Sequence, residues 1–119
     1  MDHHDEEFLR QAALAKARVT QIEPAQVDAQ AAAGALVIDV RELAERAQGT
    51  VPGSHHVALD TLAQNIQAVV PDKAAPIICF CNGGNRGALA AAQLLDLGYT
   101  NVQSIAGGLR AYDVHKKNK

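Results

Sequence analysis

The segment from residue 77 to residue 97 changes from an apolar run to a glycine-rich turn and then to a helical pattern, and this order limits the folds that the chain can adopt. A continuous apolar run, Ile77-Ile78-Cys79-Phe80, leads through Cys81 into a glycine-rich turn, which opens a helix rich in alanine and leucine. Short continuous apolar runs are typical of strands buried in parallel sheets. The helix is apolar on nearly every side, so it has to pack against such a sheet. A strand, a tight turn and a covering helix indicate an α/β domain.

The rest of the chain repeats this alternation of helical and strand-like segments. We expect helices over residues 5–18, 23–33, 42–47, 61–70, 88–97 and 109–116, and strands over residues 19–22, 35–38, 56–59, 77–80 and 101–105. This order predicts a mainly parallel central sheet of about five strands, with helices on both faces. Ligands of such sheets bind beyond the carboxyl ends of the strands, where Asp39 and Cys81 both fall.

Length and charge narrow the possibilities further. A chain of 119 residues has room for one such domain, and we expect a helical extension over residues 1–18 followed by the domain over residues 19–119. The formal net charge of −2 gives no electrostatic reason for nucleic acid or membrane partners. No apolar stretch approaches the ~20 residues that span a bilayer, and residues 1–7 are acidic and polar, unlike a signal peptide. We therefore expect a cytoplasmic protein.

Cys81 is the candidate nucleophile. A thiolate is best stabilised at the carboxyl end of a strand, where it faces a helix N-terminus and an arginine. Adjacent glycines let successive backbone N–H groups turn toward one point, so the turn forms an anion-binding concavity. Its expected members are Asn82, Gly83, Gly84, Asn85, Arg86 and Gly87. No nearby base is required, because the nucleophile in such a loop is already ionised.

The remaining candidates for chemistry have simpler interpretations. Cys79 lies within the apolar run and is expected to be a core residue rather than a resolving thiol. Two cysteines separated by one residue make an implausible structural disulfide, which agrees with a reducing compartment. Adjacent histidines lack the spacing of a preformed metal site, so no metal and no cofactor are expected from His3-His4 or His55-His56. An inert, buried Cys81 stays open as an alternative.

Four segments of the chain are similar, in order and spacing, to the signature motifs of one family. They are Val37-Ile38-Asp39-Val40-Arg41-Glu42, Gly49-Thr50-Val51-Pro52-Gly53-Ser54, Cys81-Asn82-Gly83-Gly84-Asn85-Arg86 and Gly107-Gly108-Leu109. Through them the chain resembles a single-domain rhodanese, a sulfurtransferase of the thiosulfate:cyanide type. The resemblance covers roughly residues 19–115 and implies a rhodanese-like fold.

The resemblance also implies a persulfide mechanism in two steps. Cys81 would attack the outer sulfur of a donor such as thiosulfate, and sulfite would leave. The persulfide sulfur would then pass to a thiol, to cyanide or to a protein acceptor. Asp39 and Arg41 are expected to support the loop and not to react. The Asp39 carboxylate can accept hydrogen bonds from loop N–H groups or pair with Arg41.

Two other kinds of function stay open. Asn82 replaces an arginine that is common at this position in the family, so Arg86 is the only cation of the loop. This departure leaves room for a non-catalytic binding or regulatory module. Thr50 and Leu109 stand where the family often has a histidine and a tryptophan. A phosphatase or arsenate reductase is the third possibility. Loops of that kind resemble this one but place arginine six positions after cysteine, whereas Arg86 is five positions after Cys81. A smaller ring of N–H donors suits a sulfur atom better than a tetrahedral phosphate.

Overall fold

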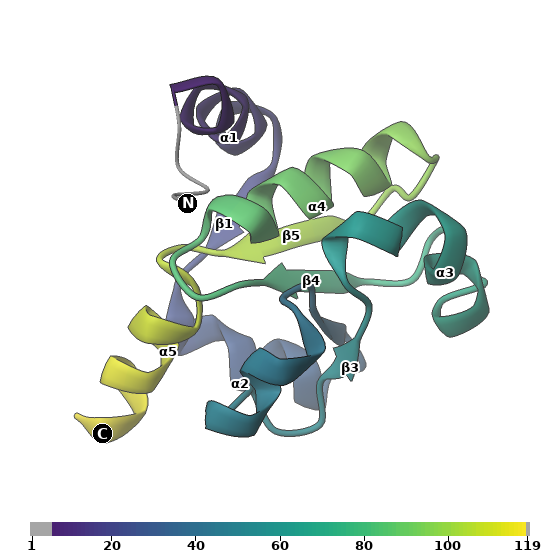
Figure 1. Cartoon of the computed structure of the whole chain (residues 1–119). Helices are drawn as coiled ribbons and strands as arrows, with labels where there is room; N and C mark the ends of the chain where they lie inside the picture. The colour runs from purple at the N-terminus through teal and green to yellow at the C-terminus, as the bar shows by residue number, and fades with distance from the viewer. Residues whose placement is uncertain (1–5, 119) are drawn as a thin grey trace.

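The computed structural model describes residues 6–118, which form five parallel strands surrounded by helices (Figure 1). The spatial order of the strands is β1-β5-β4-β2-β3, and every pair is parallel. The strands are β1 (Thr20–Ile22), β2 (Leu36–Asp39), β3 (His55–His56), β4 (Ile77–Phe80) and β5 (Val102–Ile105). This arrangement confirms the predicted fold class and places β4 at the centre of the sheet.

Helices cover both faces of the sheet, as expected from the alternation in sequence. In Figure 1, α1, α3 and α4 lie on one face, and α2 and α5 lie on the other. The α-helices are α1 (Glu6–Arg18), α2 (Pro24–Ala32), α3 (Leu62–Val69), α4 (Asn85–Asp96) and α5 (Gly108–Lys117). Two 3₁₀ segments, η1 (Leu43–Gln48) and η2 (Leu59–Thr61), lie in the connections after β2 and β3.

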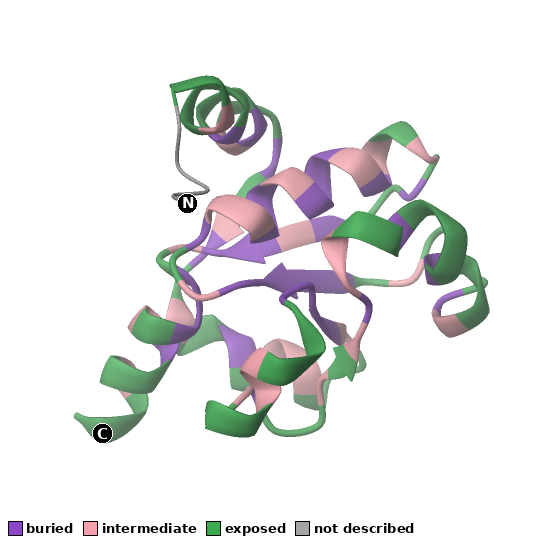
Figure 2. Cartoon of the chain, viewed as in Figure 1, coloured by how far each residue is buried: buried purple, intermediate pink, exposed green. Residues whose placement is uncertain are grey.

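The alternation of side chains along β4 divides the core into two parts. Ile77 and Cys79 face the layer of α1, α3 and α4, whereas Ile78 and Phe80 face α2 and α5. All four are buried, and Figure 2 shows that the buried residues follow the sheet. A strand that is buried on both faces needs no polar alternation, which is why β4 reads as a continuous apolar run.

The position of α4 explains why its sequence is apolar on nearly every side. One side of α4 packs on the sheet, and α1 packs against it from outside (Figure 1). The helix also starts at Asn85, three residues before the expected start at residue 88, so its first turn lies inside the glycine-rich segment. A Cβ atom at Gly87 would lie only 3.1 Å from the Phe80 Cα, so glycine permits the close approach of α4 to β4.

One expectation about the connections was wrong in detail. The strand expected over residues 56–59 is only two residues long, because β3 ends at His56 and the chain turns into η2 at Leu59. Backbone N–H groups of Val57 and Leu59 still reach the carbonyls of Asp39 and Val40, at 3.0 Å each. The short helix expected over residues 42–47 is present as the 3₁₀ helix η1. Within residues 6–118, no helix has the length and apolar character needed to cross a bilayer.

Candidate active site

Cys81 directly follows β4 and lies at the base of a pocket. Only 2% of its surface is exposed, yet it lines a pocket of ≈ 390 Å³. The backbone N–H groups of Gly84 and Gly87 each donate a hydrogen bond to its Sγ, with N···S distances of 3.2 Å. The residues that line the pocket are Leu9, Cys81, Asn82, Gly83, Asn85, Arg86 and Arg110.

The first turn of α4 makes this N–H arrangement possible. Gly84 precedes the helix with φ +110°, a left-handed conformation that side-chain-bearing residues rarely adopt. In this conformation the backbone N–H groups of Gly84 and Gly87 both point at the Cys81 sulfur. Unpaired N–H groups at a helix N-terminus carry partial positive charge, so the sulfur lies where a negative charge is favoured.

The carbonyl groups of the same loop are held by α5. The Cys81 carbonyl accepts a hydrogen bond from the Leu109 N–H at 2.8 Å, and the Asn82 carbonyl accepts one from the Arg110 N–H at 3.1 Å. A Cβ atom at Gly108 would lie 2.6 Å from both carbonyl oxygens, so only glycine allows this contact. The Gly107-Gly108 motif therefore brings the N-terminus of α5 onto the loop.

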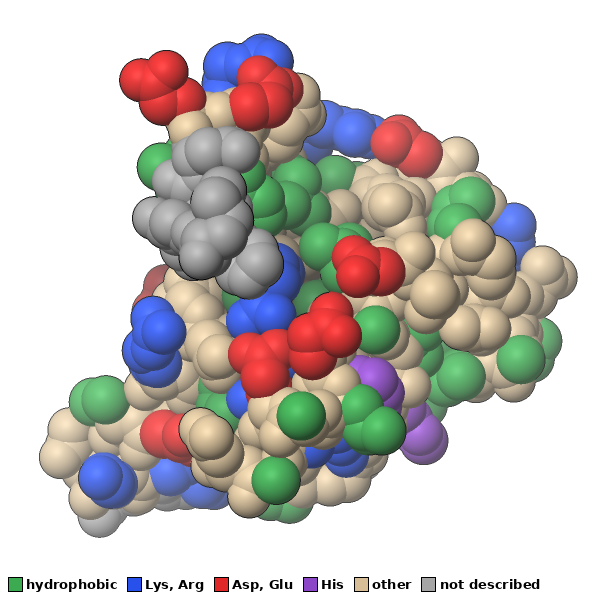
Figure 3. Space-filling model, in the orientation of Figure 1, with side chains coloured by type: hydrophobic (Ala, Val, Ile, Leu, Met, Phe, Trp, Pro, Cys, Tyr) green, Lys and Arg blue, Asp and Glu red, His purple; other side chains and the backbone are tan. Residues whose placement is uncertain are grey.

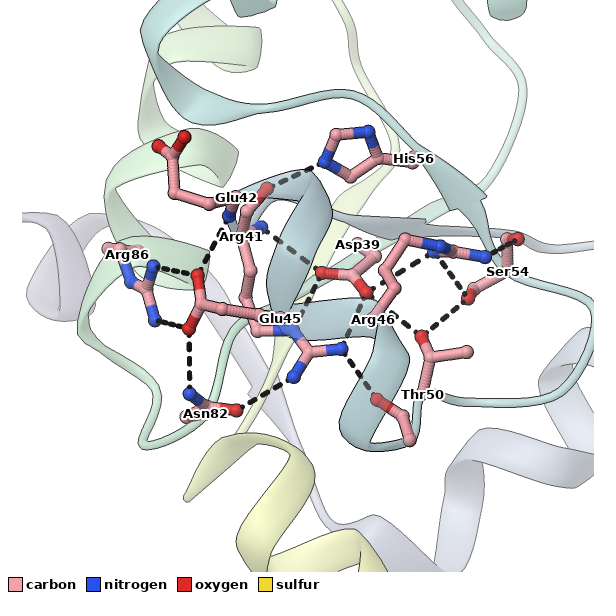
Figure 4. Close-up of polar contacts among 11 residues, drawn as sticks. Asp39, Arg41, Glu42, Glu45, Arg46, Thr50, Ser54, His56, Asn82 and Arg86 are labelled. Carbon is pink, nitrogen blue, oxygen red and sulfur yellow. Dashed lines mark hydrogen bonds and ion pairs between the residues drawn. The ribbon is translucent and has the colours of Figure 1, made fainter.

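Asp39 and Arg41 form a buried ion pair beside the loop (Figure 4). The Arg41 Nε and Nη2 atoms donate to the two Asp39 carboxylate oxygens at 2.9 and 2.8 Å. The backbone N–H of Arg41 also donates to Asp39 Oδ1, at 3.1 Å. Thr50 Oγ1 and Arg46 Nη1 also contact the carboxylate, at 2.9 and 3.2 Å. Burial raises the pKa of Asp39, but the hydrogen bonds from Arg41 and Thr50 outweigh it and leave the pKa below its ordinary value.

Asn82 connects this pair to the loop and to η1. Its Oδ1 accepts a hydrogen bond from Arg41 Nη1 at 3.0 Å, and its Nδ2 donates to Glu45 Oε2 at 2.9 Å. Both ends of the amide are therefore used. An arginine at this position could not accept the bond from Arg41, so Asn82 fits this particular network.

Arg86 does not present a free charge to the pocket. Its Nη1 and Nη2 atoms bind the two Glu45 carboxylate oxygens at 2.8 and 3.0 Å, and Figure 4 shows Glu45 between Arg86 and Asn82. The hydrogen bond with Glu45 is the main reason that the pKa of Arg86 is raised, and Cys81 adds a smaller contribution. The expectation that Arg86 alone supplies the positive charge of the loop therefore needs revision, because a carboxylate pairs with it.

Comparisons with known proteins agree with this geometry. Residues 23–115 match the Rhodanese-like domain model. Among curated relatives, the thiosulfate sulfurtransferase GlpE of Pseudomonas fluorescens is 35% identical over 92 residues, which cover 77% of this chain and 83% of the relative. The chain belongs to the rhodanese family. GlpE of Pseudomonas aeruginosa is 34% identical over the same length, with 77% and 82% coverage.

Solved structures share the fold of this rhodanese. The human single-domain sulfurtransferase TSTD1 has a TM-score of 0.70 and 27% identity, with 82% of this chain and 97% of the human chain covered. A Rhodopseudomonas palustris protein described as a possible tyrosine phosphatase has a TM-score of 0.84 and covers 98% of this chain and 96% of its own. At 22% identity, that second likeness concerns the fold alone. The chain is a rhodanese-type sulfurtransferase.

The second cysteine of this rhodanese lies in the core, as expected. Cys79 is fully buried in β4, and burial raises the pKa of its thiol to about 12. Among residues 6–118, no three His, Cys, Asp or Glu side chains cluster as a metal site would require. His56 Nε2 donates to the Arg41 carbonyl at 2.7 Å, and His3-His4 lie outside the described residues.

Sequence reasoning missed three residues at the site: Leu9, Glu45 and Arg110. Glu45 comes from η1, Leu9 from α1 and Arg110 from α5, so each is far in sequence from Cys81. Arg110 directly follows the Gly107-Gly108-Leu109 motif, and this adjacency was the available signal. No local pattern connects Leu9 or Glu45 with the loop, because only the tertiary structure brings them there.

Proposed function

We propose that Cys81 carries sulfur as a persulfide between a sulfane donor and an acceptor. The observation that supports this proposal most directly is the pair of N–H groups, from Gly84 and Gly87, at 3.2 Å from the Cys81 Sγ. These donors stabilise an anionic sulfur without a general base. The curated relatives are named thiosulfate sulfurtransferases, so thiosulfate is the first donor to test.

The first step moves one sulfur atom onto the enzyme. The Cys81 thiolate attacks the outer sulfur of thiosulfate and forms a new S–S bond. The bond between the two thiosulfate sulfur atoms breaks, and its electron pair leaves with sulfite. The negative charge then lies on the outer sulfur of the persulfide. The N–H groups of the loop, from Asn82 to Gly87, are the groups proposed to bind the thiolate and the persulfide.

The second step returns the enzyme to its thiolate form. A thiolate or cyanide attacks the outer persulfide sulfur, the S–S bond breaks, and its electron pair returns to Cys81. The products are a new persulfide or thiocyanate. Asp39 and Arg41 act as positioning residues, since Arg41 fixes Asn82 while Asp39 holds Arg41.

The proposal includes a small sulfane-sulfur donor, a thiol or protein acceptor, and a cytoplasmic location. A reducing compartment agrees with a working free thiol. Cys79 is the only other cysteine in this sequence, and its separation of one residue makes a disulfide with Cys81 implausible. The face drawn in Figure 3 carries acidic and basic side chains next to one another near its middle. Such a mixed surface gives no field of one sign for nucleic acid or anionic membranes.

Donor-dependent persulfide formation tests the proposal. After incubation with thiosulfate, we expect mass spectrometry to find one additional sulfur atom, on Cys81. Cys81→Ser should gain none, whereas the matched variant Cys79→Ala should gain the same single atom. Adding cyanide should remove the sulfur and release thiocyanate. An unmodified wild-type thiol after treatment with thiosulfate and with organic sulfane donors would refute the proposal.

The alternative is a rhodanese-like module that binds a partner without catalysis. The paired charges of Arg86 and Glu45 favour it, because they weaken the attraction for a dianionic donor. In that case Cys81→Ser should retain a protein partner captured by the wild type, and the wild type should show no turnover. A phosphatase or arsenate reductase remains a third, less favoured alternative, and hydrolysis of a phosphate ester or reduction of arsenate would support it.

A further inference from the structure

The pocket above Cys81 contains one arginine whose charge is not paired. Arg86 binds Glu45, and Arg41 and Arg46 bind Asp39. Within residues 6–118, the side chain of Arg110 makes neither a hydrogen bond nor an ion pair, although it lines the pocket. The charge available to an anionic ligand there is therefore a single positive charge.

Backbone contacts fix the position of Arg110 relative to the nucleophile. Its N–H donates to the Asn82 carbonyl at 3.1 Å, which attaches the first turn of α5 to the active loop. Its Nη1 lies 3.1 Å from where a Cβ atom of Gly83 would be, so the guanidinium lies over the loop. Glycine at position 83 leaves this space open.

The apolar part of the pocket comes from α1, outside the stretch that matches the family model. Leu9 lines the pocket while 46% of its surface is exposed. The helix that carries it is held against α4 by buried Ala12 and Ala15 and by an ion pair between Arg18 and Asp96 at 2.8 Å. Leu9 is therefore an apolar contact on a fixed element.

We propose that Arg110 and Leu9 select the sulfur donor, and that the preferred donor is an organic thiosulfonate, with one negative charge and an apolar group. This inference rests on the persulfide function proposed for Cys81. Arg110 would bind the sulfonyl oxygens through charge-assisted hydrogen bonds, and Leu9 would contact the organic group. The pocket of ≈ 390 Å³ has room for a small donor of this kind.

The charges near the pocket favour a monoanion over the thiosulfate dianion. Arg110 supplies one unpaired positive charge, because Arg86 is paired with Glu45. An adjoining pocket that Arg110 also lines contains Arg41, which is paired with Asp39, and the carboxylates Glu45 and Asp113. A second negative charge on the donor would find no second unpaired cation in the pocket, and the Asp113 carboxylate would repel it.

The chemical step with this donor balances in the same way as the step with thiosulfate. The Cys81 thiolate attacks the terminal sulfur of R–SO₂–S⁻ and forms an S–S bond. The bond from that sulfur to the sulfonyl sulfur breaks, and its electron pair leaves with the sulfinate R–SO₂⁻. One negative charge stays on the Cys81 persulfide and one leaves on the sulfinate.

Rates of persulfide formation on Cys81 test this inference with three donors: benzenethiosulfonate, methanethiosulfonate and thiosulfate. For the full-length wild type, kcat/KM should be highest with benzenethiosulfonate. Arg110→Gln should lower that value about tenfold or more, because a charge-assisted hydrogen bond is lost, and Arg110→Lys should restore much of it. The matched control Lys117→Gln removes an exposed positive charge from the same helix and should change the rate less than twofold.

Leu9→Ala separates the apolar contact from the charge. It should lower kcat/KM roughly fivefold with benzenethiosulfonate and little with methanethiosulfonate, because only the larger group reaches Leu9. Leu14→Ala is the matched control, since Leu14 is a similarly exposed leucine of α1 that lines a different groove. Alkylation of Cys81 by neutral iodoacetamide should be nearly unchanged in Arg110→Gln and Leu9→Ala, which would show that the loop is intact.

The possible outcomes separate the two proposals. Persulfide formation in the wild type at rates that do not depend on Arg110 or Leu9, or that favour thiosulfate, would overturn the donor preference and leave the sulfurtransfer function standing. Equal loss of thiosulfonate reaction and iodoacetamide alkylation in Arg110→Gln would assign Arg110 a structural role and also overturn it. Failure of the wild type to take sulfur from any donor would overturn both proposals.

Discussion

At the scale of single residues, the Asp39 carboxylate connects the end of β2 with the active loop. It holds Arg41, and Arg41 in turn holds Asn82. Asp39 is fully buried and only 2% of Arg41 is exposed, so the two charges depend on each other. Removing one partner of a buried pair leaves the other charge without compensation.

Asp39→Asn should therefore destabilise the protein strongly. We expect the free energy of unfolding to fall by about 3–5 kcal/mol, because the Arg41 guanidinium stays buried without its counter-charge. Chemical denaturation monitored by circular dichroism measures this change. Arg10→Gln, which breaks an exposed ion pair with Glu7 on α1, serves as the control and should cost about 1 kcal/mol or less. Similar losses for both variants would contradict this role for Asp39.

The same variant should change how stability depends on pH. The pKa of Asp39 is lowered in the folded protein, so the folded state favours the carboxylate. Its contribution to stability is complete above the pKa of an unfolded aspartate and is lost as pH falls through the lowered folded pKa. Wild-type stability should decrease over this acidic range, and Asp39→Asn should show a smaller decrease. The remaining slope includes Glu45, whose pKa is lowered chiefly by Arg86.

At the scale of elements, the contact between α5 and the active loop depends on a glycine. Gly108→Ala would place a Cβ atom 2.6 Å from the Cys81 and Asn82 carbonyls and would also require a left-handed φ of +65°. We expect a loss of about 2–4 kcal/mol, the sum of conformational strain and overpacking, together with slower persulfide formation.

Gly53→Ala is the matched control for this element. Gly53 has φ +79°, but no atom lies within 4 Å of its Cβ position, so this variant carries the strain without the clash. Its cost should be about 1–2 kcal/mol, with the rate of sulfur transfer unchanged. Thermal melts and the persulfide assay compare the two variants directly. Equal effects on stability and rate would rule out the steric role of Gly108.

The elements near the site differ in how well the sequence predicted them. The strand β4 matches its prediction, because four consecutive apolar residues bounded by turns are a local signal. The helix α4 starts earlier than expected, since Asn85 and Gly87 in its first turn have weak helix propensity and are held in place by the loop and the sheet. The third strand is shorter than expected, because β3 is an edge strand that pairs with β2 alone.

At the scale of the whole molecule, α1 closes the outer side of α4. All five strands lie within residues 20–105, so the sheet is complete without α1. We expect a chain shortened to residues 19–119 to fold, with a free energy of unfolding lower by on the order of 2 kcal/mol, because part of the apolar surface of α4 becomes exposed. Thermal unfolding measured by circular dichroism tests this.

The full-length variant Ala15→Asp provides a comparison for that truncation. It places a charge in the contact between α1 and α4, so it should also lower the free energy of unfolding. A shortened chain that loses its cooperative transition would show that the helix is part of the domain. The proposed boundary between residues 18 and 19 would then be wrong.

The site as a whole was predictable only in part. The nucleophile and its loop are contiguous in sequence, so composition and order indicated both of them. Asp39 and Arg41 lie within one motif, and the structure brings them to the loop through Asn82. Leu9, Glu45 and Arg110 come from three separate elements, and their convergence depends on packing that no local pattern encodes.

The contact of α5 with the Cys81 and Asn82 carbonyls has a consequence for biosynthesis. A ribosome releases residues 81–87 before residues 108–110, so the sulfur-binding loop emerges without the N–H groups that later hold its carbonyls. The loop takes its final shape only after about twenty further residues have been added. A released chain that ends before Gly108 would thus carry Cys81 in an incomplete site, and the reactivity of that thiol would report whether α5 has docked on the loop.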